Sequence, residues 1–103
     1  GMSSEAPRSG VALVALGEEA LRGAFAIAHQ IRLAGLVCEM DLDGRSLKAQ
    51  LRNADRARMR YAVILGSTEL AKGAAAVKDL SVSDIPQKEV SLAGLVDFFK
   101  KAN

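Results

Sequence analysis

The sequence contains few of the residues from which metal sites, disulfides and catalytic triads are built. Among its 103 residues there is one cysteine, one histidine and no tryptophan. A single thiol can form neither an internal disulfide nor a zinc site, so Cys38, inside the apolar run LVCEM, is predicted to be a buried structural thiol. His29 falls toward the polar edge of a helical pattern, with no obvious nucleophile near it in the sequence. We therefore predict no metal site and no active site in this chain.

Long hydrophobic runs are also missing. No apolar run approaches the roughly 20 residues of a membrane helix, and the opening residues GMSSEAPRSG lack the apolar core of a signal peptide. The glycine before the first methionine resembles the remnant of a tag. We expect residues 1–9 to be a disordered remnant or linker and residues 10–103 to form one domain of a cytoplasmic protein.

What the sequence does contain is a series of short apolar runs that alternate with amphipathic segments. Its apolar residues are mainly Ala, Val and Leu, which suits helices packed on a sheet. Strands are predicted over residues 11–16, 36–40, 61–65, 74–80 and 87–90, and helices over 18–34, 46–58 and from Ser91 to the C-terminus. The helical spacing places Phe25 and Leu47 among the inward-facing side chains. The order predicts an α/β fold: β-α-β-α-β, then an antiparallel hairpin and a C-terminal helix, giving a mixed five-stranded sheet with three helices packed on it.

The stretch LGSTELAKG, residues 65–73, raises the question of a phosphate loop. It has two glycines and a lysine, but in the wrong order for the Walker pattern, and Glu69 would compete with a bound anion. The turn after the first strand, GEEALRG, lacks the middle glycine of a dinucleotide fingerprint. Neither turn is therefore predicted to bind phosphate.

Positive charge is concentrated in one part of the chain. Between Arg45 and Arg60 there are six basic residues and one acid, Asp55, although the whole chain carries a net charge of only +2. Lys48, Arg52 and Arg56 recur every fourth residue and drift only about 80° around the helix axis, so they form one stripe. A solvated charged face and a contact with a polyanion both fit this pattern, and the scarcity of acids favours the polyanion.

Five segments in order resemble a known family: VALVALGEEA, GRSLKAQLRNAD, RYAVILGSTELAKG, AVKDL and QKEVSLAGLVDFF. Together they resemble the C-terminal anticodon-binding domain of class II aminoacyl-tRNA synthetases, closest to the histidyl enzymes. The resemblance covers about residues 10–101 and implies the same mixed five-stranded sheet. It departs from the family where Arg58 occupies a position that is commonly glycine, and where the turn GSTE carries less acid than usual.

The resemblance also implies which residues touch RNA. It assigns the reading of anticodon bases to Glu69, Lys78 and Arg52, with Gly17 and Glu18 on the same rim. Phosphate contacts would come from the basic residues Arg45, Lys48, Arg56 and Arg58. A carboxylate can accept hydrogen bonds from guanine, while Lys and Arg can donate to base acceptors or phosphates. Few stacking platforms are expected, because Tyr61 and the three phenylalanines are predicted to be internal.

The implied partners are the anticodon stem-loop of tRNA(His) and the catalytic domain of a homodimeric parent enzyme, with no DNA and no membrane. The domain itself would hold no cofactor, whereas the parent enzyme would use ATP and Mg²⁺. An excised domain of such an enzyme is the favoured interpretation. A stand-alone paralogue acting as a protein-interaction or regulatory module, and a small-ligand domain using the crevice at the first strand, stay open as alternatives.

Overall fold

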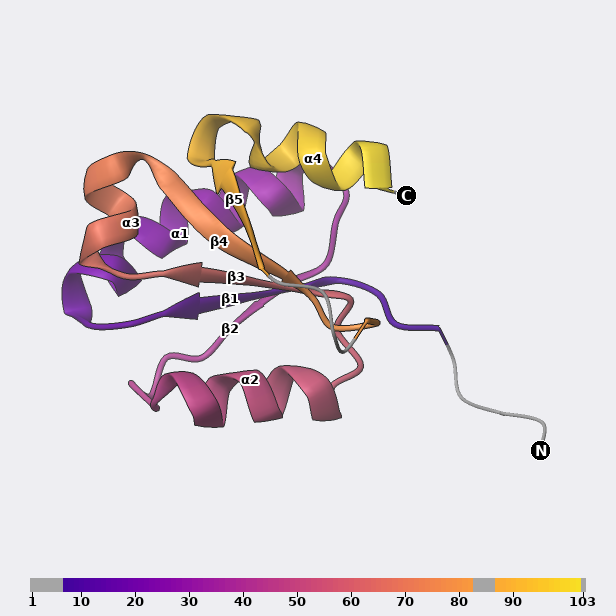
Figure 1. The fold of residues 1–103 in the computed structure, drawn as a ribbon, viewed down its shortest axis with the longest axis horizontal. Helices are drawn as coiled ribbons and strands as arrows, with labels where there is room; N and C mark the ends of the chain where they lie inside the picture. The colour runs from indigo at the N-terminus through magenta and orange to yellow at the C-terminus, as the bar shows by residue number, and fades with distance from the viewer. Residues whose placement is uncertain (1–6, 83–86, 103) are drawn as a thin grey trace.

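The computed structural model describes residues 7–82 and 87–102 and has a mixed five-stranded sheet at its centre (Figure 1). The strand order is β2-β1-β3-β4-β5. The strands run over β1 Val11–Ala15, β2 Cys38–Met40, β3 Tyr61–Leu65, β4 Ala74–Asp79 and β5 Lys88–Ser91. β1 pairs in parallel with β2 and β3, while β4 is antiparallel to both β3 and β5. The predicted fold is confirmed, including the central place of β3 and the terminal hairpin.

Helices cover the two faces of the sheet unequally. Helix α1 (Glu18–Leu33) and helix α4 (Leu95–Ala102) lie on one face, and helix α2 (Leu47–Arg56) lies on the other (Figure 1). The larger core, between the sheet and α1 and α4, contains Leu13, Val63 and Phe99. The core under α2 is smaller and is built around Val14, Ala62 and Ile64.

The buried face of α1 consists mostly of alanines. Ala20, Ala24 and Ala28 are at most 1 % exposed, which lets the helix lie close to the sheet. Phe25 is 52 % exposed, so the prediction that it points inward is wrong. It follows Ala24 by one residue, about 100° around the axis, and that rotation carries it off the buried stripe.

Helix α2 begins where the sequence predicts. The side chain of Ser46 accepts a hydrogen bond from the backbone N–H of Ala49, as an N-cap should. Leu47, however, is 37 % exposed, and the buried polar residue of this helix is Gln50. The predicted burial of Leu47 is therefore wrong: Leu47 is the first residue of α2, at the end of the helix, and its side chain is exposed.

A fourth helix replaces the turn predicted after β3. Helix α3 (Ser67–Lys72) connects β3 to β4, so the described residues contain four α-helices where three were predicted. Its six residues are too few to show a helical period in the sequence. Gly73 ends it in a left-handed conformation with φ of 73°. The chain closes with a 3₁₀ turn (Leu92–Gly94), capped by Ser91, that leads directly into α4.

Two smaller predictions concern Cys38 and the N-terminal segment. Cys38 is buried, and burial raises the pKa of its thiol, so the predicted structural thiol is confirmed. Within the segment predicted to be disordered, residues 1–6 lie outside the described part of the chain. Arg8 forms an ion pair with Asp55, and the N–H of Ser9 donates to the carbonyl oxygen of Arg58 at 3.0 Å, so these two residues belong to the folded domain.

Candidate nucleic-acid interface

The basic stripe on α2 is exposed and uncompensated. Lys48, Arg52 and Arg56 are all exposed, and none of them forms an ion pair with a residue in the described ranges 7–82 and 87–102. Since α2 is the only helix that residues 7–82 and 87–102 place on this face of the sheet, no neighbouring described helix screens these charges (Figure 1). The stripe can therefore attract an anion along the length of the helix.

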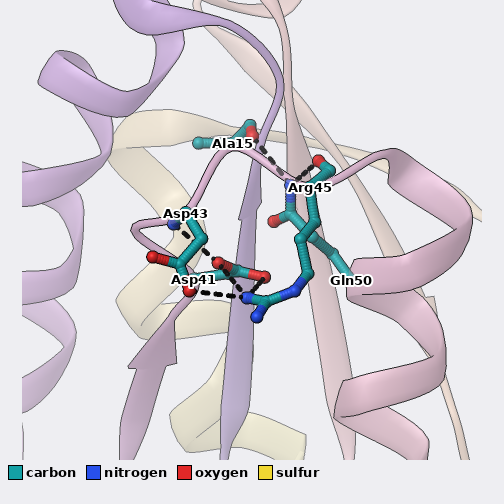
Figure 2. A network of polar contacts seen from close by, with 5 residues as sticks. All are labelled: Ala15, Asp41, Asp43, Arg45 and Gln50. Carbon is teal, nitrogen blue, oxygen red and sulfur yellow. Dashed lines mark hydrogen bonds and ion pairs between the residues drawn. The ribbon is translucent and has the colours of Figure 1, made fainter.

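The other basic residues of this region are largely neutralised. One Nη of Arg45 lies 2.9 Å from a carboxylate oxygen of Asp41 and 2.9 Å from one of Asp43 (Figure 2). Arg60 pairs with Asp79 at 3.4 Å. The sequence window that began at Arg45 left out both of the acids that precede it. Arg45 is thus a weaker candidate for a phosphate contact than the members of the stripe.

Lys78 extends the basic surface onto the sheet. It lies opposite Ala62 in the β3–β4 register, and paired residues of antiparallel strands project from the same face. Ala62 belongs to the small core under α2, against which Leu51 and Ala76 also pack. Lys78 therefore shares the α2 face of the sheet with the basic stripe.

Glu69 lies in the first turn of α3. Its Oε1 accepts a hydrogen bond from the backbone N–H of Gly66 at 2.7 Å. Because glycine has no side chain, this is half of a capping box. The carboxylate is thus already engaged in starting α3, although it has further lone pairs with which to accept from a ligand.

The candidate residues fall into two groups at opposite ends of the sheet. The backbone N–H of Leu16 donates to the carbonyl oxygen of Leu65, so Gly17 and Glu18 lie beside Gly66 and Glu69 at the end of the sheet where β1 and β3 finish. β4 starts at that end of the sheet with Ala74, and Lys78 lies four residues further along it. At about 3.3 Å per residue, Lys78 is about 13 Å from that end. The single rim expected to carry both Glu69 and Lys78 is therefore not formed.

Arg52 lies midway along α2, between these two ends of the sheet. Arg58 lies at the far edge, beyond the end of α2, and has φ of 59°. Glycine favours this left-handed region, which explains why a glycine was expected at that position.

An acidic crevice beside α2 was not anticipated from the sequence. It lies between β2 and α2, on the flank opposite Lys78, and Glu39, Asp41 and Asp43 are among its lining residues. Hydrogen bonds from the backbone N–H of Asp43 and from the side chain of Arg45 lower the pKa of Asp41, which keeps its carboxylate ionised. The run DLDGR contains the signal for this cluster, because two acids and an arginine lie within five residues.

Residues 7–82 and 87–102 contain neither a candidate metal-binding cluster nor a helix that could span a membrane. No group of three or more His, Cys, Asp and Glu side chains there is arranged to hold a metal ion. No helix within the same ranges has the length and apolar character needed to span a membrane.

Comparison with known proteins places this geometry in a family. The family model described as "Anticodon binding domain" matches residues 10–102. The histidine–tRNA ligase of Halothermothrix orenii is 40 % identical over 91 residues, covering 88 % of this chain and 21 % of the ligase. That of Desulfitobacterium hafniense is 50 % identical over 72 residues, 70 % of this chain and 17 % of the ligase. The chain thus spans about a fifth of the length of these relatives.

Solved structures agree with the sequence matches. The histidyl-tRNA synthetase of Nostoc sp. PCC 7120 superposes with a TM-score of 0.82 at 31 % identity, covering 94 % of this chain and 23 % of the synthetase. The RNA binding domain of threonyl-tRNA synthetase from Cryptosporidium parvum superposes with a TM-score of 0.81 at 18 % identity, covering 92 % of this chain and 23 % of that one, which shows a shared fold.

Proposed function

This chain belongs to the anticodon binding domain family, and on that premise we propose that it binds the anticodon stem-loop of tRNA(His). In this proposal it supports the ligation of histidine to tRNA by a catalytic core that lies outside this chain. That core would use ATP and Mg²⁺ in a cytoplasmic homodimer, and the domain would contribute RNA affinity without a cofactor of its own. The similarity to histidine–tRNA ligases over most of the chain supports this choice of tRNA.

The observation that carries the proposal is the uncompensated basic stripe on α2. Lys48, Arg52 and Arg56 have no described carboxylate partner, and Lys78 lies on the same side of the sheet. Phosphates of an RNA stem can lie along such a stripe. Proteins usually read single-stranded RNA through unstacked loop bases. Such bases can then reach the sheet face or the end of the sheet that carries Glu69.

The salt dependence of binding to a fluorescent anticodon hairpin tests the electrostatic part. Each phosphate contact contributes about 0.7 to 0.9 to the slope of log affinity against log salt concentration. If Lys78 and each of the three stripe residues make one contact, four in all, the slope should be about −3. Arg52→Ala should reduce its magnitude by slightly less than one unit.

Arg22→Ala provides the matched control. Arg22 is also an exposed arginine without a described ion-pair partner, but it lies on α1, in the layer on the other side of the sheet. Its replacement should leave the slope nearly unchanged. Equal effects of the two substitutions would mean that RNA does not lie along α2.

Base reading is tested separately with hairpins whose anticodon has been changed. Glu69→Gln and Lys78→Gln should each reduce the difference in affinity between the tRNA(His) anticodon and the altered one. If the unaltered domain binds both hairpins equally, it does not read the anticodon. A module for protein interaction or regulation then becomes the better interpretation.

A further inference from the structure

The crevice between β2 and α2 has the size and the lining of a small-molecule site. Its volume is about 730 Å³, within the usual range for ligand pockets. Ala12 and Val14 of β1 form its floor, and the side chains of Ala54 and Met59 add to its apolar lining. Methionine side chains adapt to ligands of different shape. The crevice can therefore hold a short apolar group.

The most informative group in this crevice is the buried amide of Gln50. The residue is only 3 % exposed, and its Nε2 donates to the carbonyl oxygens of Ala15 at 3.2 Å and Arg45 at 2.6 Å. Because both partners are acceptors, the amide can take only this orientation. Its Oε1 then has no hydrogen-bond partner among the described residues, although Gln50 lines the crevice. Figure 2 shows this oxygen on the side of Gln50 that faces Asp41 and the guanidinium of Arg45.

A buried carbonyl oxygen without a donor is costly, and a ligand that brings an N–H group would remove that cost. The same oxygen cannot be satisfied by an anion, which offers no donor. The site therefore selects for a ligand that donates hydrogen bonds.

Charge narrows the choice further. The lining includes three carboxylates, Glu39, Asp41 and Asp43, against the single guanidinium of Arg45, which already pairs with two of them. The crevice thus has a formal excess of two negative charges. Such a surface attracts cations and repels the phosphates of a nucleic acid.

We propose that the β2–α2 crevice binds a small organic cation, a guanidinium or primary ammonium group on a short aliphatic chain. The cationic head donates to Gln50 Oε1 and lies near the carboxylate of Asp43, while the aliphatic chain contacts Ala54 and Met59. Both a free amine and an arginine or lysine side chain of a protein carry this chemistry. The site lies on the flank of α2 opposite Lys78, so its occupancy does not depend on the proposed RNA function.

Titration of the labelled chain with butylguanidinium, followed by NMR, tests the proposal. A ligand of this size should bind with a dissociation constant of about 1 mM. Its binding should shift the side-chain amide signals of Gln50 and the backbone amides of Ala54 and Met59. Butylurea has a similar shape and also donates N–H groups but lacks the charge, so it should bind about fivefold more weakly.

Variants that each remove one charge test the proposal by the direction in which the affinity for butylguanidinium changes. Asp43→Asn should weaken butylguanidinium binding about fivefold, whereas Asp97→Asn, which removes an acid from α4 in the other layer, should leave it unchanged. Arg45→Gln should strengthen binding, because it frees the carboxylates of Asp41 and Asp43. The same Arg45 substitution should not strengthen RNA binding, so a gain in affinity confined to butylguanidinium separates the two functions.

A capped tripeptide with a central arginine distinguishes the two sources of the cation. Binding of butylguanidinium alone supports a free amine, and binding of both probes supports a protein side chain as well. The proposal is overturned if the Gln50 signals do not move at about twenty times the expected dissociation constant. It is equally overturned if Arg45→Gln weakens the binding of butylguanidinium.

Discussion

Arg58 should destabilise the domain through its backbone conformation, and two substitutions at this position can measure the effect. Among the described residues it is the only non-glycine residue with positive φ, at 59°. A Cβ in the left-handed region costs about 1 to 2 kcal/mol. Arg58→Gly and Arg58→Ala remove the same side-chain interactions and differ only in that Cβ. We therefore expect the glycine variant to be the more stable of the two by about 1 kcal/mol.

Position 57, next to Arg58, supplies a control at which glycine is expected to have the opposite effect on the free energy of unfolding. Ala57 caps the end of α2 with φ of −79° and ψ of 2°, a conformation that any residue adopts without strain. Ala57→Gly should lower the free energy of unfolding by about 0.5 to 1 kcal/mol, because glycine loses more backbone entropy on folding. Glycine should thus stabilise relative to alanine at position 58 and destabilise relative to alanine at position 57.

Urea unfolding of the four proteins, the unaltered chain and its three variants, measures these differences. In thermal unfolding a change of 1 kcal/mol should move Tm by about 4 to 8 °C for a domain of this size. The reasoning fails if Arg58→Ala is as stable as Arg58→Gly. It also fails if position 57 gives the same sign as position 58, since the local backbone would then not be the cause.

Three further predictions follow from single contacts. The thiol of Cys38 should react with a thiol reagent only on unfolding, because it is buried with a raised pKa; rapid labelling of the native protein would contradict that burial. Glu69→Ala should lower the free energy of unfolding by about 1 kcal/mol and Glu69→Gln by much less, since Gln keeps an oxygen for the N–H of Gly66; equal losses in urea unfolding would rule out this hydrogen bond as the cause. Burial raises the pKa of Asp79, but hydrogen bonds from Ser81 and Arg60 outweigh burial and bring the pKa below its ordinary value of 3.8. The ionised Asp79 therefore stabilises the folded domain fully above that pH, and this stabilisation is lost as the pH falls further. Asp79→Asn should therefore cost up to about 1 kcal/mol at neutral pH and less in acid, and a cost that grew in acid would show the opposite sign of shift.

Glu69 has a structural role at the start of α3 and a proposed role in base reading, and both affect how RNA experiments are interpreted. Its Oε1 holds the first turn of α3, so Glu69→Ala changes both the charge and the shape of that edge. Glu69→Gln changes only the charge. A loss of base discrimination in the glutamine variant therefore reports on RNA contact, while an additional loss in the alanine variant reports on α3.

The sequence by itself determined the sheet and most of its helices. Continuous apolar runs such as 61–65 mark strands buried on both faces, and Ser46 marks the start of α2 by a local hydrogen bond. Both signals lie within a few neighbouring residues, so they can be read from the chain. Burial of Cys38 followed for the same reason, since the run around it is apolar.

Only the tertiary structure decided which side chains share a surface. Glu69 and Lys78 are near in sequence yet lie toward opposite ends of the sheet, because β4 runs away from the edge that carries α3. Gln50 and Ala15 are far apart in sequence yet form a hydrogen bond. Strand direction and the packing of a helix on a sheet fix such distances, and neither is encoded in the spacing of residues along the chain. For this reason the sequence alone predicts the basic stripe, which lies on one helix, but not the acidic crevice, which β1, β2 and α2 form together.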